Sequence, residues 1–361
     1  TSEFSEWGNS SSLNIIDSSF FTFQINTSLV AGTSFSFQMD DAVDVYIDWG
    51  DTNIDADNDG TGLFSHSYSG DGVYNVSIAG EASRVSFYEG TEDMLIDILS
   101  NMSDGMTGIN SAYRMFRDAD NIVSFTEEAW FDDVSSNVTD MREMFYGAGS
   151  FNQNLSSWNT HNVTSLANIF AYASDFNGNV STWNTSKVTS MYYAFSSAAS
   201  FNQPLNDWDT SSVTIMSSMF SSASDFNQPL NGWNTSKVTT MSSMFSYASS
   251  FNQSINSWNT SSVIDMSYMF SHATFFNQPL NGWNTSSVID MDWMFWGADL
   301  FNQSLTNWST SNVQDMNNMF RDADSFNGNL SGWDTHNVTD MNGMFIFADY
   351  FNWDISNCNN S

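Results

Sequence analysis

The strongest constraint on this sequence is a repeat of 25 residues. Phe-Asn pairs recur at this spacing from Phe151 to Phe351, and tryptophans recur with it from Trp158 to Trp333. A related unit around Phe116 precedes them after a four-residue insertion, so the array covers roughly residues 110–361. A fixed period of this size is the signature of a repeat architecture. Because one unit is too small to bury its own apolar face, stacked units should form a solenoid with a continuous core.

The residues of one unit predict two elements. Ser287 and Asp290 resemble a capping box, and the apolar residues that follow have the spacing of one helix face: Val288, Met291, Met294, Phe295 and Ala298. The segment 276–280 is typical of a short strand, which Pro279 limits because proline cannot donate to a ladder. We therefore expect an α/β repeat solenoid with one short helix and one short strand per coil. Equivalent Phe, Trp and Met side chains should stack in ladders, and the Asn after each Phe should bond backbone groups at the bend.

The unit V-T-x-M-x-x-M-F-x-x-A-x-x-F-N-Q-x-L-x-x-W-[ND]-T-S resembles the repeat of the BspA-like, DUF285-type surface proteins, which are leucine-rich-repeat-like. The departures are Leu166, Ile169 and Ala194 in place of Met, and Cys358 in place of Trp. The resemblance implies a secreted or surface-anchored protein, extracellular or on the cell surface. It carries no catalytic motif, and the sequence has no nucleophile elbow or phosphate loop. We therefore do not expect an enzyme.

The residues before the repeats have a different pattern. Segments 20–25, 35–39, 43–51 and 72–78 alternate between apolar and polar residues, as half-buried strands do. Several residues resemble the signature of the PKD-type domain, a small immunoglobulin-like sandwich: Trp49, Gly50, Asp51, His66, Tyr68, Gly72 and Tyr74. The resemblance implies a spacer or binding module of extracellular proteins. We expect an N-terminal arm over 1–19, an all-β, immunoglobulin-like PKD-like domain over 20–82 and the solenoid over 83–361, with 83–110 covering the first coil.

Charge and composition exclude several classes of partner. The chain has 41 acidic and 7 basic residues and a net charge of −34, which argues against nucleic acid and against docking on anionic lipid. No apolar run reaches the roughly 18 residues of a membrane-spanning helix, so membrane insertion is not expected. The single cysteine, Cys358, rules out an internal disulfide and leaves a free thiol or a bridge to another chain.

Two kinds of polar site are candidates. Asp55, Asp57 and Asp59 begin a D-x-D-x-D-G sequence like the front half of a calcium loop, although His66 stands where the bidentate Glu belongs. A solvated, Asx-rich loop explains the same residues, and no other cofactor is expected. The chain also has 18 N-x-[ST] sequons, partly inherited from the repeat, and in a eukaryotic source N-linked glycans would coat the rod. The sequons best placed for sugar are Asn9, Asn26, Asn75, Asn154, Asn179, Asn184, Asn234, Asn252, Asn259, Asn284, Asn302 and Asn329.

The last unit suggests self-assembly. Apolar residues crowd it, and no further unit follows to cover them: Phe345, Phe347, Tyr350, Phe351, Trp353 and Ile355. A large exposed apolar patch marks an interface, and head-to-tail contacts build filaments unless the rotation closes a ring. We therefore expect a secreted structural protein, the subunit of an extracellular filament, whose partner is a second copy of itself.

Two other functions compete with this interpretation. The chain could be a cell-surface adhesin or receptor that binds a protein or glycan on the solenoid face, or a glycan-coated matrix protein that does not polymerise in order. Repetitive Ser, Asn, Thr, Gly and Asp at exposed positions favour structure over recognition. Repulsion at a charge of −34 would oppose self-association unless salt or divalent cations screen it.

Overall fold

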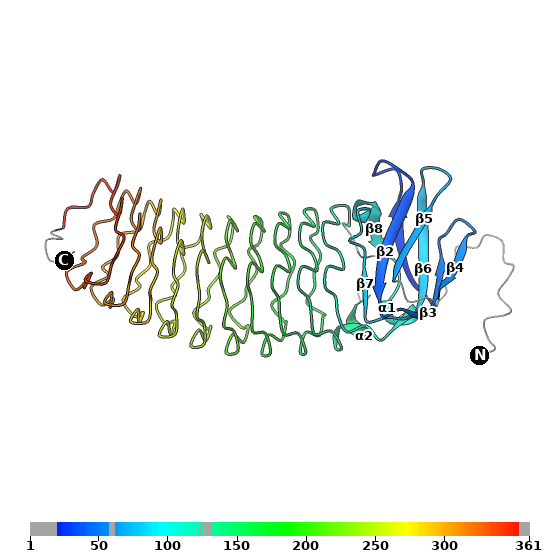
Figure 1. Ribbon diagram of the computed structural model, residues 1–361, viewed down its shortest axis with the longest axis horizontal. Helices are drawn as coiled ribbons and strands as arrows, with labels where there is room; N and C mark the ends of the chain where they lie inside the picture. Colours follow the sequence, from blue (N-terminus) through cyan, green and yellow to red (C-terminus); the bar gives the residue numbers. More distant parts are fainter. Residues whose placement is uncertain (1–19, 58–61, 123–124, 126–130, 354–361) are drawn as a thin grey trace.

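The computed structural model describes residues 20–57, 62–122, 125 and 131–353. They form an elongated rod with a β domain at one end and stacked coils along the rest (Figure 1). The predicted arm over 1–19 lies outside the described residues, as do Asn9, Asp59, Ile355 and Cys358.

The β domain consists of two sheets. The larger has the strand order β4-β3-β6-β1-β8, with β9 added in parallel to β6: β4 (Ile54–Asp57), β3 (Val43–Asp48), β6 (Val73–Glu81), β1 (Phe21–Asn26), β8 (Leu95–Ile98) and β9 (Met106–Thr107). The smaller is antiparallel, in the order β5 (Leu63–Ser67), β2 (Ser34–Asp40) and β7 (Arg84–Ser86). The strands predicted over 20–25, 35–39, 43–51 and 72–78 are confirmed. Three short helices complete the described elements: η1 (Glu92–Met94), α1 (Met102–Gly105) and α2 (Asp132–Ser135).

Aromatic side chains fill the space between the two sheets. Phe23 of β1 contacts Phe35 and Phe37 of β2, with ring centroids 6.0 and 5.8 Å apart. At the edge of this core the Trp49 ring stacks on His66 at 5.1 Å, and the Tyr68 hydroxyl donates to the Trp49 carbonyl oxygen at 3.0 Å. The period-two pattern of each strand thus places one apolar row inside the sandwich.

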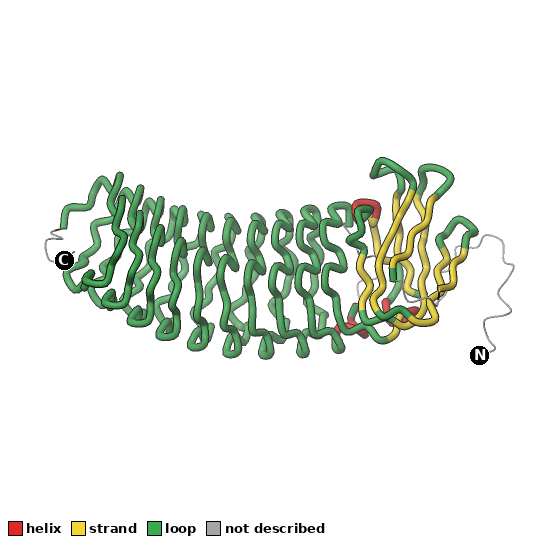
Figure 2. Tube along the Cα trace, viewed as in Figure 1, coloured by secondary structure: helices red, strands yellow, loops and turns green. Residues whose placement is uncertain are grey.

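The solenoid is not an α/β array. The expected helix and strand in each coil are wrong, because α2 is the only helix among the described residues after 110 and strands are confined to the β domain (Figure 2). Each coil instead contributes one residue to a column of parallel β-bridges that runs from Ser111 to Asp340. Residues 276–280, where the strand was expected, form no bridge.

Backbone hydrogen bonds explain why the segment expected to be helical forms tight turns. The N–H groups of Met294 and Trp296 donate within the turn, three residues back, but those of Trp293 and Phe295 donate to the next coil. A helix would satisfy all four groups internally. Trp293 also has a positive φ of 53°, which a right-handed helix does not allow. Apolar residues three or four apart fit successive tight turns as well as they fit a helix face.

The predicted phenylalanine and tryptophan ladders are confirmed. Equivalent phenylalanines stack from coil to coil, such as Phe276 on Phe301 at 6.0 Å, and equivalent tryptophans stack with nearly parallel planes, such as Trp283 on Trp308 at 6.1 Å and 4°. Each Trp ring N–H in the ladder from 183 to 333 donates to a backbone carbonyl of the preceding coil, as Trp308 does to Leu280 at 3.0 Å. The core therefore consists of parallel columns of like residues, and hydrogen bonds join the tryptophan column to the preceding coil at each step from 183 to 333.

Candidate functional site

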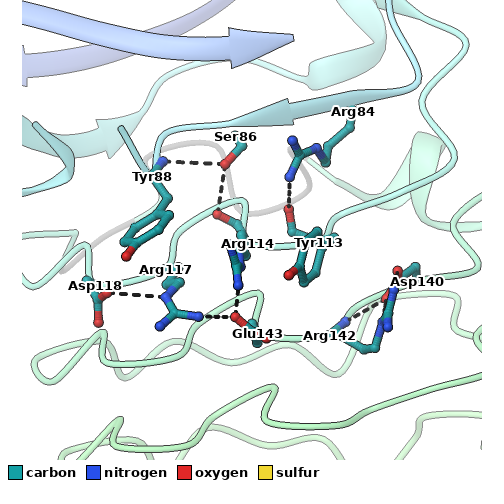
Figure 3. Close-up of polar contacts among 10 residues, drawn as sticks. All are labelled: Arg84, Ser86, Tyr88, Tyr113, Arg114, Arg117, Asp118, Asp140, Arg142 and Glu143. Carbon is teal, nitrogen blue, oxygen red and sulfur yellow. Dashed lines mark hydrogen bonds and ion pairs between the residues drawn. The ribbon is translucent and has the colours of Figure 1, made fainter. Parts of the chain in front are cut away.

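The first coil of the solenoid is covered by the end of the β domain. The Phe87 N–H donates to the Met115 carbonyl oxygen at 3.0 Å, and the Phe87 ring stacks on Phe116 at 5.6 Å. Two donors of β7 satisfy further carbonyls of this coil: Arg84 Nη1 donates to Tyr113 at 3.2 Å and Ser86 Oγ donates to Arg114 at 3.1 Å (Figure 3). The expectation that residues 83–110 cover the first coil is confirmed for residues 84–87, whereas Leu95–Ile98 pairs with β1 as β8.

Four of the chain's seven basic residues gather at this junction: Arg84, Arg114, Arg117 and Arg142. Glu143 accepts from both Arg114 and Arg117, and Asp140 pairs with Arg142 at 2.7 Å (Figure 3). The Arg117 guanidinium also lies over the Tyr146 ring, 4.2 Å from its centroid. Each arginine thus has both a carboxylate or carbonyl partner and an aromatic face, which is the arrangement that favours guanidinium groups.

The tight turn that follows each bridge residue binds the next coil through a row of hydrogen bonds that point one way. In this row the N–H belongs to the earlier coil and the carbonyl to the later one, as in Phe145 to Ile169 and Phe320 to Met344, both at 2.9 Å. Two other rows point the opposite way, as in Thr339 to Gln314 at 2.8 Å and Tyr350 to Asp324 at 3.3 Å. In the coil before the last, four N–H groups donate to the later coil in the manner of the first row. The equivalent four N–H groups of the last described coil have no acceptor among the described residues: Met341, Gly343, Phe345 and Phe347. Among the described residues, this row therefore has its carbonyls covered at the first coil and its donors without acceptors at the last described coil.

Exposed apolar side chains surround this open row of donors. Tyr350 is 69% exposed, Phe347 63% and Trp353 44%, whereas Phe345 and Phe351 continue the ladders and are partly buried. The structure thus brings together five of the six residues predicted as an assembly surface, and Ile355 lies outside the described residues.

The predicted glycosylation sites fall into two groups. Four sit at exposed turns, where the side-chain oxygen accepts from the serine N–H two residues on: Asn184, Asn234, Asn259 and Asn284. Asn252 and Asn302 instead belong to the asparagine ladder, in which the side-chain oxygen accepts the backbone N–H of the equivalent Asn in the next coil. Of the remaining sites, Asn154 is exposed, and four are half-buried: Asn26, Asn75, Asn179 and Asn329.

The predicted calcium residues begin in a strand. Asp55 lies in β4, paired opposite Ile47 of β3, and its Oδ2 accepts the Trp49 ring N–H at 2.7 Å. The side chain of Asp57 lies outside the described part of the chain, as does the whole of Asp59. Among the described residues, no group of three or more His, Cys, Asp or Glu side chains is arranged to hold a metal ion.

One surface was missed at the level of sequence. We call it the turn face: residues 142, 143, 146 and 147 and their equivalents at 25-residue steps. In a middle coil these positions are all serine, Ser217, Ser218, Ser221 and Ser222, whereas later coils place aromatic rings there, including Tyr268, His272, Trp293 and Trp296. The sequence does carry a signal for the turn face. Its residues are the x positions of the pattern M-x-x-M-F-x-x, which differ from one unit to the next.

Comparison with known families decides what the solenoid is. A family model described as "Mycoplasma protein of unknown function, DUF285" matches residues 110–231, 203–298 and 276–361, which together cover about 70% of the chain. The chain belongs to the DUF285 family. The DUF285 match begins where the coils begin, so it covers the solenoid and not the β domain. No curated protein matches the chain, and no helix in the described part of this DUF285 protein has the length and hydrophobicity to cross a bilayer.

Proposed function

We propose that this DUF285 protein is a non-enzymatic structural protein of the cell surface, extracellular and elongated, whose copies join head to tail into a filament. One observation carries the proposal. The last described coil presents four N–H donors, those of Met341, Gly343, Phe345 and Phe347, which are equivalent to the donors with which earlier coils bind the next coil. Backbone groups that have no partner within 131–353, next to exposed aromatic rings, are typical features of an edge that another chain can extend.

The opposite end of the rod offers a matching edge. Strand β4 lies at the end of the β domain away from the solenoid (Figure 1) and pairs only with β3 among the described strands. Its outer edge therefore has backbone carbonyls available to accept hydrogen bonds, as in peptide recognition by strand addition. A contact between this edge and the last coil of another copy is heterologous, so it extends without closing unless the rotation happens to suit a ring.

Further parts of the proposal rest on resemblance and exposure. The β domain serves as a PKD-like joint between successive rods, supported by the cluster of Trp49, His66 and Tyr68. N-linked glycans attach at the exposed turns of Asn184 and its equivalents if the source glycosylates. Calcium at the loop after Asp55 remains a candidate for screening the charge between copies.

Sedimentation velocity over a range of protein concentrations tests this proposal. Phe347→Ser combined with Tyr350→Ser should lower the mean assembly size, because both rings are exposed at the proposed contact. Phe275→Ser is the matched control, since Phe275 is 58% exposed but lies on the side of the rod. A double variant that assembles like the wild type would overturn the head-to-tail contact.

An adhesin function is favoured by a different observation, the variation of the turn face. Structural ladders need like residues in each coil, but the turn face changes from serine to aromatic and charged residues along the rod. Such variation on a solenoid surface is what recognition of a partner requires.

A further inference from the structure

The turn face of the later coils carries a connected group of aromatic rings. Trp293 stacks on Tyr268 at 5.9 Å and meets Trp296 edge to face at 4.6 Å. Trp296 in turn meets His272 at 4.3 Å. These four rings come from two successive coils, so they form one continuous surface along the rod and not a set of isolated side chains.

Carboxylates lie directly against these rings. Asp322 Oδ2 accepts the Trp296 ring N–H at 3.0 Å. Asp292 is next to Trp293 in the chain, its backbone carbonyl accepts the Tyr268 N–H at 2.9 Å, and its Oδ1 is buried with no hydrogen-bond partner among the described residues. We call Tyr268, His272, Trp293, Trp296, Asp292 and Asp322 the aromatic-acidic patch. The patch combines electron-rich ring faces with negative charge, which together favour a cation.

The junction at the other end of the solenoid shows how this chain fills such a surface. The sequence Met-Phe-Arg-Asp-Ala-Asp occurs at 115–120 and again at 319–324, and the Arg–Asp pairs, Arg117 with Asp118 and Arg321 with Asp322, have the same separation of 3.3 Å. At the junction four arginines lie over tyrosine rings, the nearest being Arg117 at 4.2 Å from the Tyr146 centroid.

The aromatic-acidic patch has the same rings and acids but far less positive charge of its own. Arg321 is the one arginine over its rings among the described residues, at 5.9 Å from the Trp293 centroid. The remaining basic residues, Lys187 and Lys237, lie in coils before the patch. We propose that the aromatic-acidic patch binds an arginine-bearing segment of another protein, whose guanidinium groups lie over Trp293 and Trp296 and pair with Asp322, whose side chain is 40% exposed.

This recognition does not depend on filament assembly, because the patch lies on the side of the rod and not at its ends. The charge of the chain supports the choice of partner: at −34 it attracts basic segments and repels acidic ones. Charge alone would attract a basic segment to any part of the rod. The aromatic rings are what give the patch a preferred position and a preference for arginine over lysine.

The test uses a fluorescently labelled peptide, acetyl-Gly-Arg-Gly-Arg-Gly-amide, with anisotropy as the readout. Salt is kept at about 0.15 M, where charges more than about 8 Å apart are largely screened. Trp293→Ala should weaken binding about fivefold, the factor that corresponds to a loss of roughly 1 kcal/mol of cation–π attraction. Asp322→Asn, which changes charge without changing shape, should weaken binding in the same direction.

Matched controls separate the patch from general attraction. Tyr193 occupies the turn-face position of Trp293 four coils earlier, so Tyr193→Ala should leave the affinity unchanged. Trp293→Phe keeps a ring in place and should retain most of the binding, which distinguishes loss of the ring face from loss of folding. The lysine version of the peptide should bind more weakly than the arginine version.

Two results would overturn the proposal. Equal affinities for the wild type, Trp293→Ala and Asp322→Asn would mean that the peptide follows net charge alone. Binding of a neutral oligosaccharide such as chitotriose, lost in Trp293→Ala while peptide binding persists, would make the patch a glycan site.

Discussion

The side-chain oxygen of Asn252 accepts the backbone N–H of Asn277, one coil later, at 3.0 Å. The same oxygen accepts from the Gln278 side-chain amide at 3.0 Å. The step from Asn152 to Asn177 repeats the first bond, and so does each step to Asn352. The asparagine ladder thus supplies the acceptors that a β-sheet would supply, along an edge where the chain forms no strand.

Replacing Asn252 with alanine should destabilise the solenoid. The change removes one acceptor of two hydrogen bonds, which is worth about 1–3 kcal/mol. Asn252→Asp keeps an acceptor and should cost less. Asn259→Ala is the control, because the Asn259 side chain is exposed and, among the described residues, bonds only to Ser261 in its own turn. Urea unfolding measures all three, and equal losses for Asn252→Ala and Asn259→Ala would contradict a structural role for the ladder.

Removing Arg84 should loosen the junction between the β domain and the first coil. Its guanidinium pairs with both oxygens of Asp40, at 2.7 and 3.1 Å, and donates to the Tyr113 carbonyl. Hydrogen bonds to charged groups are each worth about 1.5–3 kcal/mol, and partial exposure of Asp40 reduces this. We expect faster hydrogen exchange at the Phe87 amide in Arg84→Ala. Arg84→Lys should not restore the protection of the Phe87 amide, because a lysine ammonium cannot form the paired hydrogen bonds that the guanidinium makes to both oxygens of Asp40. Unchanged exchange in Arg84→Ala would show that Phe87 is held without it.

Asp292 lies beside the aspartates at the bridge positions of successive coils, Asp265, Asp290 and Asp315, and should make stability depend on pH. Burial and the neighbouring Asp290 carboxyl raise the pKa of Asp292 to about 7. Because the pKa of the folded state lies above the unfolded value near 4, stability is greatest below about pH 4 and falls as pH rises through about 7. Asp292→Asn removes this loss. Its free energy of unfolding relative to the wild type should therefore increase between pH 4 and pH 8, and a constant difference would contradict the shift.

Sequons at exposed turns should carry more sugar than those in the asparagine ladder. The Asn184 and Asn284 side chains are exposed, whereas Asn252 is half-buried and already accepts two hydrogen bonds from the next coil. Expression in a eukaryotic secretory host followed by glycopeptide mass spectrometry gives the occupancy of each site. Equal occupancy at Asn252 and Asn284 would mean that the sugar is attached before the coil forms.

The sequence predicted the parts of the fold that depend on repetition and alternation. The 25-residue period is sufficient to stack Phe276 on Phe301, and alternation is sufficient to place β1 and β2. It did not predict the tight turns, because most of their positive-φ positions are filled by residues such as Ser218 and Trp293, and glycine stands at few of them, namely Gly147, Gly297 and Gly343. Where glycine is absent from these positions, two successive turns have the same residue pattern as a short helix.

Some of the candidate sites could likewise be predicted from the sequence, and others could not. The exposed rings of Phe347 and Tyr350 followed from the composition of the last unit. The arginine cluster did not, since Arg84 and Tyr113 are far apart in the chain and meet only once β7 covers the first coil. The direction of the hydrogen bonds between coils is a property of backbone geometry, and side-chain patterns do not encode it.

Electron microscopy of the intact protein tests the central claim most directly. The chain is imaged at low and at physiological salt, because a net charge of −34 must be screened before copies can join. The account predicts filaments at physiological salt in which the β domain of one copy abuts the last coil of the next, with an axial repeat of one rod. Single rods at every salt and protein concentration, or filaments joined side to side, would contradict it.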